Sequence, residues 1–172
     1  DNADYYTPLD GDELVDHCGG VRDLKDGIVR SIGPPQERLK EDPVRVLRAL
    51  KLVAEYGFTL EPSLKQAVAD VAPMIHKSSP SRLFEELLKI YAKPYVAKTF
   101  EAFHEHAFLK HYLPEIAAVW QTETGQVMHR LLAERDRRKA GDRYSKSRTL
   151  ALATTAMPVA ATEALGVDPG GP

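Results

Sequence analysis

Several features that would define a class of protein are missing from this sequence of 172 residues. It contains one cysteine, Cys18, so no disulfide can form within the chain, which fits a reducing compartment. No apolar run approaches the roughly 20 residues of a membrane-spanning helix, and no basic-then-apolar stretch typical of a signal peptide stands at its start. We therefore expect a cytoplasmic protein without a membrane partner.

Motifs of the commonest chemistries are absent as well. There is no phosphate-binding loop and no Gly-x-Gly-x-x-Gly pattern. His104, His106 and His111 are spaced two and five residues apart, whereas metal ligands on one helix face are spaced three or four apart. We interpret these histidines as part of a polar helix face, and we predict no metal ligand and no catalytic residue in this chain.

The residues that are present indicate a globular and mainly helical protein. Apolar residues make up 43% of the chain and charged residues 28%, while the net charge is only −2. From residue 42 onward apolar residues recur with helical spacing, whereas residues 13–18 and 27–33 favour β-structure. The sequence predicts a bundle of six or seven helices, preceded by a small β remnant of a larger sheet that is mostly absent from this chain.

Prolines and capping residues predict where the helices begin, and apolar stripes predict which faces are buried. The first helix has Asp42 as its N-cap and ends at Gly57. Later helices begin at Pro62, Ser79–Pro80, Pro94, Pro114 and near Val127, and a weaker one near Ser145. The stripes are Val46, Leu47, Leu50, Val53 and Ala54; Leu64, Val68, Val71 and Ile75; Leu83, Phe84, Leu87, Leu88 and Tyr91; Val96, Phe100, Phe103 and Ala107; Val127, Met128, Leu131 and Leu132.

The start of the first helix is crowded with charge. Asp42 and Arg45 are three residues apart and therefore face the same side of a helix. They are interpreted either as a helix cap with an ion pair, or as an acceptor and a donor that read a nucleotide base. Adenine and cytosine each present an amino group beside a ring-nitrogen acceptor and match the pair, whereas guanine and uracil present the reverse pattern. The spacing leaves both interpretations open.

A basic segment follows further along the chain. Between Arg130 and Arg148 there are eight basic and three acidic residues. Such a block in a nearly neutral chain is typical of contact with nucleic-acid phosphates, although a solvated helix end gives the same pattern. The residues predicted to contact an RNA backbone are Arg135, Arg137, Arg138, Lys139, Arg143, Lys146 and Arg148.

Residues 19–58, GGVRDLKDGIVRSIGPPQERLKEDPVRVLRALKLVAEYGF, resemble the class II nucleotidyltransferase family of bacterial poly(A) polymerases and tRNA CCA-adding enzymes. The matching positions are Gly19, Gly20, Asp23, Leu24, Val29, Arg30, Gly33, Pro35, Glu41, Asp42, Arg45, Leu47, Arg48 and Ala49, and further on Arg82, Glu86 and Lys89. The resemblance implies that Asp42, Arg45 and Glu41 recognise the base of the incoming nucleotide, supported by Arg48, Arg82 and Glu86.

The resemblance also implies what this chain lacks. The family's Gly-Ser phosphate-binding element is absent, and Asp10-Gly11-Asp12 has the letters of its paired Asp-x-Asp metal site but lies on a loop after the expected head, so the chain alone is expected to be inactive. We expect the end of a head domain over residues 1–38, a neck over 39–92 and a helical body over 93–172. The missing head domain of the same polypeptide would hold Mg²⁺, with no ligand in this chain.

The implied function is that of a poly(A) polymerase fragment, with ATP as substrate and RNA 3′ ends as partner. The wording of EDPVRVLRALK and SRLFEELLK is more similar to poly(A) polymerases than to CCA-adding enzymes. Two alternatives stay open: a fragment of a CCA-adding enzyme, and a non-catalytic helical module that binds RNA or acts as an adaptor.

Overall fold

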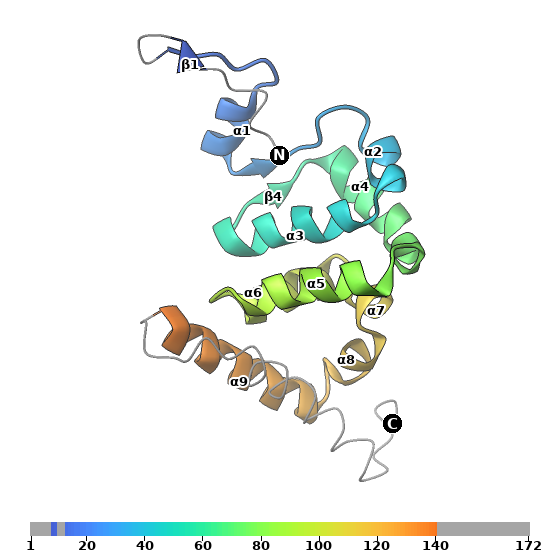
Figure 1. Cartoon of the computed structure of the whole chain (residues 1–172). Helices are drawn as coiled ribbons and strands as arrows, with labels where there is room; N and C mark the ends of the chain where they lie inside the picture. The colour runs from blue at the N-terminus through green and yellow to red at the C-terminus, as the bar shows by residue number, and fades with distance from the viewer. Residues whose placement is uncertain (1–7, 10–12, 141–172) are drawn as a thin grey trace.

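The computed structural model describes residues 8–9 and 13–140 of the chain (Figure 1). Helices dominate these residues, which confirms the predicted mainly α fold with a small β part. None of the helices in this range is long and apolar enough to cross a membrane. The elements are β1 Pro8–Leu9, β2 Glu13–Leu14, α1 Gly20–Asp26, β3 Ile28–Val29, α2 Pro35–Glu41, α3 Val44–Tyr56, β4 Thr59–Leu60, α4 Pro62–Val71, the 3₁₀ helix η2 Ala72–Lys77, α5 Pro80–Tyr91, α6 Val96–Glu105, α7 Leu109–Tyr112, α8 Pro114–Val119 and α9 Glu123–Ala140.

The helices form successive layers along the molecule. Figure 1 shows α1 and β4 at one end, then α3, then α5 with α6, and α9 at the other end. One continuous apolar core runs through these layers, from Leu47 and Leu50 of α3, through Phe100 and Phe103 of α6, to Leu132 of α9. The layered arrangement places the charged start of α3 and the basic α9 in different parts of the molecule.

Several predicted helix boundaries are confirmed. α3 ends at Gly57, whose φ of 70° is left-handed and whose N–H donates to the Val53 carbonyl over 2.9 Å. Pro62 and Pro80 occupy the first position of α4 and α5, where a missing N–H costs nothing. The Ser79 side chain accepts from the Arg82 N–H and caps α5, as its sequence position predicts.

The structure places the start of α3 one residue later than the sequence predicts. α3 begins at Val44, because a separate helix that the sequence reading missed, α2, ends at Glu41. Asp42 lies in an extended conformation between the two helices, yet its Oδ1 still accepts from the Val44 N–H over 3.2 Å. Asp42 therefore caps α3 from a tight corner, which turns its side chain toward α5.

The predicted small β part consists of strands of two residues each. In the described part of the chain, β3 pairs in parallel with β4, which the sequence reading missed, while β2 pairs with β1. The Thr59 N–H donates to the Gly27 carbonyl over 2.8 Å, and the Glu61 N–H donates to the Val29 carbonyl over 3.0 Å. This short ladder fastens the segment before α2 to the segment after α3.

Two predicted apolar stripes are only partly buried. On α5 the buried side chains are Glu86, Ile90 and Tyr91, whereas Phe84 is 52% exposed. On α9, Met128 and Leu132 are fully buried, but Val127 and Leu131 are 42% and 47% exposed. Helical spacing identifies the apolar face of a helix, but the packing partners decide how much of that face is covered. Ala107 lies beyond the end of α6, and the helix predicted near Ser145 lies outside the described residues.

Candidate nucleotide-recognition site

Asp42 joins two helices that are distant in the sequence. Its Oδ1 caps α3, and its Oδ2 lies 2.7 Å from Nη2 of Arg82 on α5. The Nε atom of Arg45 is 4.0 Å from the same Oδ2. The predicted pairing of Asp42 with Arg45 is therefore present but long, and the shorter ion pair is the one with Arg82.

Arg45 is held on its other side by α2. Its Nη1 donates to the Arg38 carbonyl over 3.2 Å and lies 3.6 Å from Oε2 of Glu41. Glu41 also accepts from the Arg38 guanidinium over 3.0 Å. The guanidinium of Arg45 is thereby fixed between two helices while about a third of its side chain stays exposed.

Glu86 lies one turn after Arg82 on α5 and is almost fully buried, with only 4% of its side chain exposed. Its two carboxylate oxygens accept from Lys89 over 2.7 Å and from Lys51 of α3 over 3.2 Å. Burial raises the pKa of Glu86, but the hydrogen bond from Lys89 and the charge of Lys51 outweigh it and hold this pKa below its usual value. The pair Lys51–Glu86 locks α5 against α3 beneath Asp42 and Arg82.

The structure thus brings Glu41, Asp42, Arg45 and Arg82 together at one corner, with Arg48 one turn further along α3. Arg48 is exposed, and its side chain has no hydrogen bond or ion pair with any residue that the structure describes. A carboxylate oxygen can accept more than one hydrogen bond, and a guanidinium has five N–H donors. The corner therefore offers an acceptor beside fixed donors, which is the combination that a base edge with an amino group and a ring nitrogen requires.

The predicted RNA-contacting residues differ in exposure, and some of them lie outside the described residues. Arg137 and Arg138 are exposed on α9, and both donate to Glu134, over 2.8 Å and 2.6 Å. Hydrogen bonds from Arg137 and then from Arg138 lower the pKa of Glu134 to about 2, so the cluster stays ionised in the neutral range. Lys139 lies in the last turn of α9, and Arg143, Lys146 and Arg148 lie outside the described residues.

Arg135 has a different environment and corrects the prediction. It is only 8% exposed, and its guanidinium donates to the Tyr91 carbonyl, to the Lys93 carbonyl over 3.0 Å and to Asp136 over 2.7 Å. Asp136 in turn accepts from the Ala97 N–H over 2.9 Å. Arg135 thus fastens α9 to the junction of α5 and α6, and it is not available to contact a phosphate.

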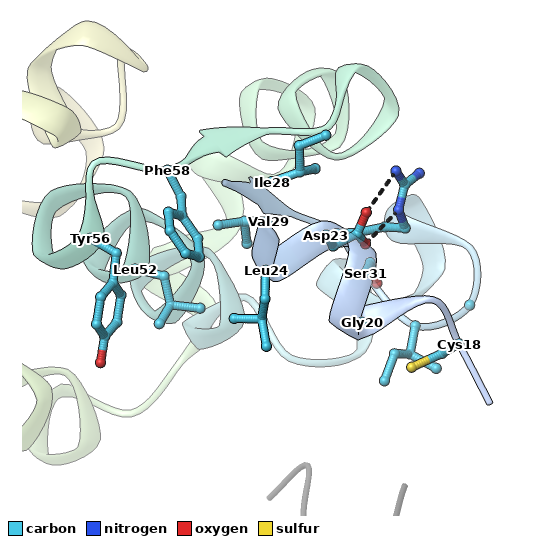
Figure 2. Close-up of a pocket in the computed structure, with 13 residues that line it drawn as sticks. Cys18, Gly20, Asp23, Leu24, Ile28, Val29, Ser31, Leu52, Tyr56 and Phe58 are labelled. Atoms are coloured by element: carbon cyan, nitrogen blue, oxygen red, sulfur yellow. Dashed lines mark hydrogen bonds and ion pairs between the residues drawn. The ribbon is translucent and has the colours of Figure 1, made fainter. Parts of the chain in front are cut away.

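An apolar hollow of about 540 Å³ opens between α1, β3 and the second half of α3 (Figure 2). Leu24, Leu52, Tyr56 and Phe58 line it, and Leu24 is 63% exposed. Asp23 and Arg30 also line it, and they are joined by hydrogen bonds of 2.8 Å and 3.2 Å. Exposed apolar side chains gathered in this way are typical of a surface that another part of a protein covers.

The described residues do not fit a site for Mg²⁺. Magnesium prefers oxygen ligands, mostly carboxylates and water. Within residues 8–9 and 13–140, no three His, Cys, Asp or Glu side chains lie close enough together to hold a metal ion. No step of the chemistry is therefore assigned to a metal held by this part of the chain.

Comparisons with known proteins identify relatives of this chain. The family described as "Probable RNA and SrmB- binding site of polymerase A" matches residues 57–119. Poly(A) polymerase I of Escherichia coli O6:H1 is 33% identical over 133 residues, which make up 77% of this chain and 28% of that protein. The CCA-adding enzyme of Anoxybacillus flavithermus is 36% identical over 105 residues, 61% of this chain and 26% of that protein.

The chain belongs to the family of bacterial poly(A) polymerases and CCA-adding enzymes. It spans less than a third of the length of these relatives. A solved tRNA nucleotidyltransferase complexed with a primer tRNA and an incoming ATP analog shares the fold with a TM-score of 0.68. That match covers 83% of this chain and 42% of that chain at 22% identity.

Two residues that hold the candidate site of this family member were missed by sequence reasoning. Lys51 binds the buried Glu86, and Arg38 binds Glu41. Arg38 and Glu41 are three residues apart, but this spacing indicates an ion pair only once helix α2 is recognised. Lys51 had no local signal, because its partner Glu86 lies 35 residues further along the chain, on α5.

Proposed function

We propose that this chain is the neck and body portion of a bacterial poly(A) polymerase. In this proposal Asp42 and Arg45 select ATP by its base, Glu41, Arg48, Arg82 and Glu86 hold or surround them, and exposed basic residues of the C-terminal part contact RNA. The complete polypeptide adds AMP from ATP to RNA 3′ ends without a template.

The ion pair between Asp42 and Arg82 is the observation that carries this proposal. A helix cap needs one carboxylate oxygen, and Oδ1 of Asp42 supplies it. The second oxygen is held over 2.7 Å by an arginine forty residues later in the chain, which in turn lies one turn before the buried Glu86. Contacts to both carboxylate oxygens fix the orientation of the Asp42 side chain. Binding a ligand requires such a fixed orientation, whereas a solvent-exposed helix cap does not.

The proposed selectivity follows from hydrogen-bond chemistry. The Asp42 carboxylate would accept from the N6 amino group of adenine, while the Arg45 guanidinium would donate to N1. Guanine would place a carbonyl beside the carboxylate and an N–H beside the guanidinium. Each buried polar group left unpaired costs about 1–3 kcal/mol, so two mismatched contacts give strong discrimination.

The rest of the polypeptide is part of the proposal. In the complete enzyme the RNA 3′-hydroxyl attacks the α-phosphate of ATP in line, and a head domain outside this chain supplies the Mg²⁺ ligands. In this proposal the head domain packs on the exposed apolar hollow around Leu24 and Tyr56. We expect the purified 172-residue chain to show no nucleotidyl transfer.

A fragment of a CCA-adding enzyme is the second candidate within the family. The longer match to poly(A) polymerase I, 77% of this chain against 61% for the CCA-adding enzyme, supports the first candidate. The two enzymes differ in their use of CTP. Tailing of an RNA with ATP alone, and with ATP plus CTP, separates them, because only a CCA-adding enzyme incorporates CTP efficiently.

The test of base selection uses the complete polypeptide. Asp42→Ala and Arg45→Ala should each lower kcat/KM for ATP by roughly 10- to 100-fold, at 1.4 kcal/mol per factor of ten, or raise the relative use of GTP and UTP. Lys98→Ala, an exposed change on α6, is the control and should match the wild type. Unchanged ATP kinetics and selectivity in both Asp42→Ala and Arg45→Ala, with an intact fold, would leave Asp42 as a helix cap only.

A further inference from the structure

A second hollow, of about 430 Å³, lies at the other end of the molecule between α6, α8 and α9. Trp120, at the end of α8, contributes an aromatic ring to its wall, and the remaining lining residues are Glu101, Gly125, Gln126, His129 and Arg130. This hollow is separate from the corner around Asp42 and from the apolar hollow beside α1. Its lining combines a flat ring with polar and charged groups, whereas the hollow beside α1 is mostly apolar.

The indole ring of Trp120 is held in a defined position. The ring centroids of His104 and His129 lie 5.9 Å and 5.7 Å from that of Trp120. The ring of Phe100 packs edge-on against Trp120, with 6.4 Å between the centroids. Gly125 lets α9 approach the backbone of α8 closely, since a Cβ at this residue would lie 2.1 Å from the Val119 carbonyl oxygen. The close approach fixes the ring against the face of α9 that carries Gln126, His129 and Arg130.

Arg130 is the unpaired cation of this hollow. It is exposed, and it makes no hydrogen bond through its side chain and no ion pair with any residue in the described part of the chain. Arg137 lies on the same helix face, seven residues further, which is about 10 Å along the axis. Residues 126, 130, 133 and 137, which follow the helical repeat, are all exposed, so an uncovered stripe runs from the hollow along α9.

We propose that this hollow binds one unpaired nucleotide of an RNA strand, with its base packed on Trp120 and its phosphate bound by Arg130. Aromatic side chains stack on any base, while a guanidinium beside them binds the backbone. Glu101 supplies an acceptor for an exocyclic amino group at the edge of the same hollow. The strand then continues along the exposed stripe of α9 toward Arg137. This inference rests on the proposed RNA binding of the chain and adds a base-stacking position to it.

The sequence supplies a direct probe, because it contains one tryptophan. The intrinsic tryptophan fluorescence of the 172-residue chain therefore reports on this hollow alone. An unlabelled single-stranded oligoadenylate is titrated at constant pH and salt, and the anisotropy of the same oligonucleotide with a fluorescent label is followed in parallel. We expect the tryptophan emission to change saturably, with the same Kd as the anisotropy.

Variants distinguish stacking from an indirect effect. Arg130→Gln should weaken binding about tenfold, whereas Arg22→Gln, an equal loss of charge on the exposed face of α1, should change it less than twofold. Trp120→Phe keeps an aromatic ring and should bind within a fewfold of the wild type, whereas Trp120→Ala should bind about tenfold more weakly. Circular dichroism of each variant checks the fold, and Arg130→Gln remains informative if Trp120→Ala unfolds.

The outcomes separate this inference from the proposed function. If anisotropy shows binding while the tryptophan emission stays constant and Arg130→Gln binds like the wild type, RNA binds elsewhere and only this inference fails. If the oligonucleotide does not bind at all, both the RNA-binding part of the proposed function and this inference fail. An emission change that Arg130→Gln leaves untouched at an unaltered Kd also overturns the site.

Discussion

Asp42 can be tested at the scale of a single side chain, because its two oxygens have separate partners. Oδ1 accepts from the Val44 N–H and Oδ2 accepts from Arg82. An asparagine retains the capping oxygen, since Asn and Asp are about equally good caps. The same asparagine presents an amide N–H₂ where a base reader needs an acceptor.

In the complete polypeptide, Asp42→Asn should therefore lower kcat/KM for ATP by roughly 10- to 100-fold while the free energy of unfolding falls by only about 1 kcal/mol. Steady-state tailing kinetics and urea unfolding, measured on the same preparations, test the two effects. Full ATP activity in this variant would contradict base reading by Asp42. A large loss of stability would instead show that the contact with Arg82 mainly holds the fold.

At the scale of elements, the buried Glu86 connects α5 to α3 through Lys51. Its folded pKa is lowered below the ordinary value of 4.5, so its ionised form stabilises the fold. That contribution is complete above about pH 4.5 and is lost as the pH falls through 4.5 toward the folded pKa. A buried carboxylate with two hydrogen-bonded lysines contributes about 2 kcal/mol, since hydrogen bonds to charged groups are stronger than neutral ones.

Glu86→Gln should accordingly destabilise the chain by about 2 kcal/mol at pH 7, and the difference from the wild type should shrink below pH 4.5. Urea unfolding at a series of pH values measures it. Glu85→Gln, the exposed neighbour on the same helix, is the matched control and should show a small difference at every pH. A difference that is independent of pH would mean that Glu86 does not stabilise the fold through its charge.

The contact between α8 and α9 depends on one glycine. A Cβ at Gly125 would lie 2.1 Å from the carbonyl oxygen of Val119, the last residue of α8, and 2.3 Å from that of Trp120, which follows it. Backbone atoms cannot rotate away, so Gly125→Ala should force the two helices apart. We expect a loss of about 3 kcal/mol or more in urea unfolding, at the upper end of overpacking costs.

Gln126→Ala at the next, exposed position serves as the control for Gly125→Ala and should change stability by less than about 0.5 kcal/mol. Because alanine is the better helix former, a chain stabilised by Gly125→Ala would show that helix propensity outweighs the close approach. That result would rule out the tight contact between α8 and α9.

At the scale of the whole molecule, RNA affinity should depend on the charge of α9. Each phosphate contact contributes about 0.7 to the slope of log K against log salt for a single strand. Replacing Arg137 and Arg138 together by Gln should therefore reduce the slope by about 1.4 and weaken binding to all sequences alike, because phosphate contacts do not read bases. Fluorescence anisotropy at several salt concentrations measures this, and parallel slopes would remove both residues from the RNA surface.

Glu134→Gln removes a negative charge beside Arg137 and Arg138, whereas the double substitution removes their positive charges. Glu134 holds both arginines and stays ionised, because their hydrogen bonds keep its pKa near 2. Without this carboxylate the two guanidiniums are free to bind phosphates, so RNA binding should tighten and its salt dependence should steepen. Weaker binding in this variant would mean that Glu134 positions the arginines for RNA, so that the pair acts as one preorganised unit.

Local patterns were sufficient for much of the helical fold. Proline at the first helical position, serine at an N-cap and Gly57 at a left-handed C-cap act through neighbouring backbone atoms, so their effects are visible in a short window of sequence. The proximity of Asp42 and Arg45 is local in the same sense, since three residues of spacing and a corner at α3 bring them to one side. Helix α2 was missed because Leu39 is its one buried residue, so the segment shows no apolar periodicity.

Long-range contacts were the part that local patterns could not provide. Arg82 meets Asp42 and Lys51 meets Glu86 only because α5 packs against α3, and β3 pairs with β4 only because α3 returns the chain beside it. Arg135 lies in a basic segment that the sequence predicts to be exposed, yet α9 turns its guanidinium toward the carbonyls of Tyr91 and Lys93. The sequence shows that a residue is charged, but it does not show whether its hydrogen bonds are made with solvent or with a distant carbonyl. Packing decides between the two.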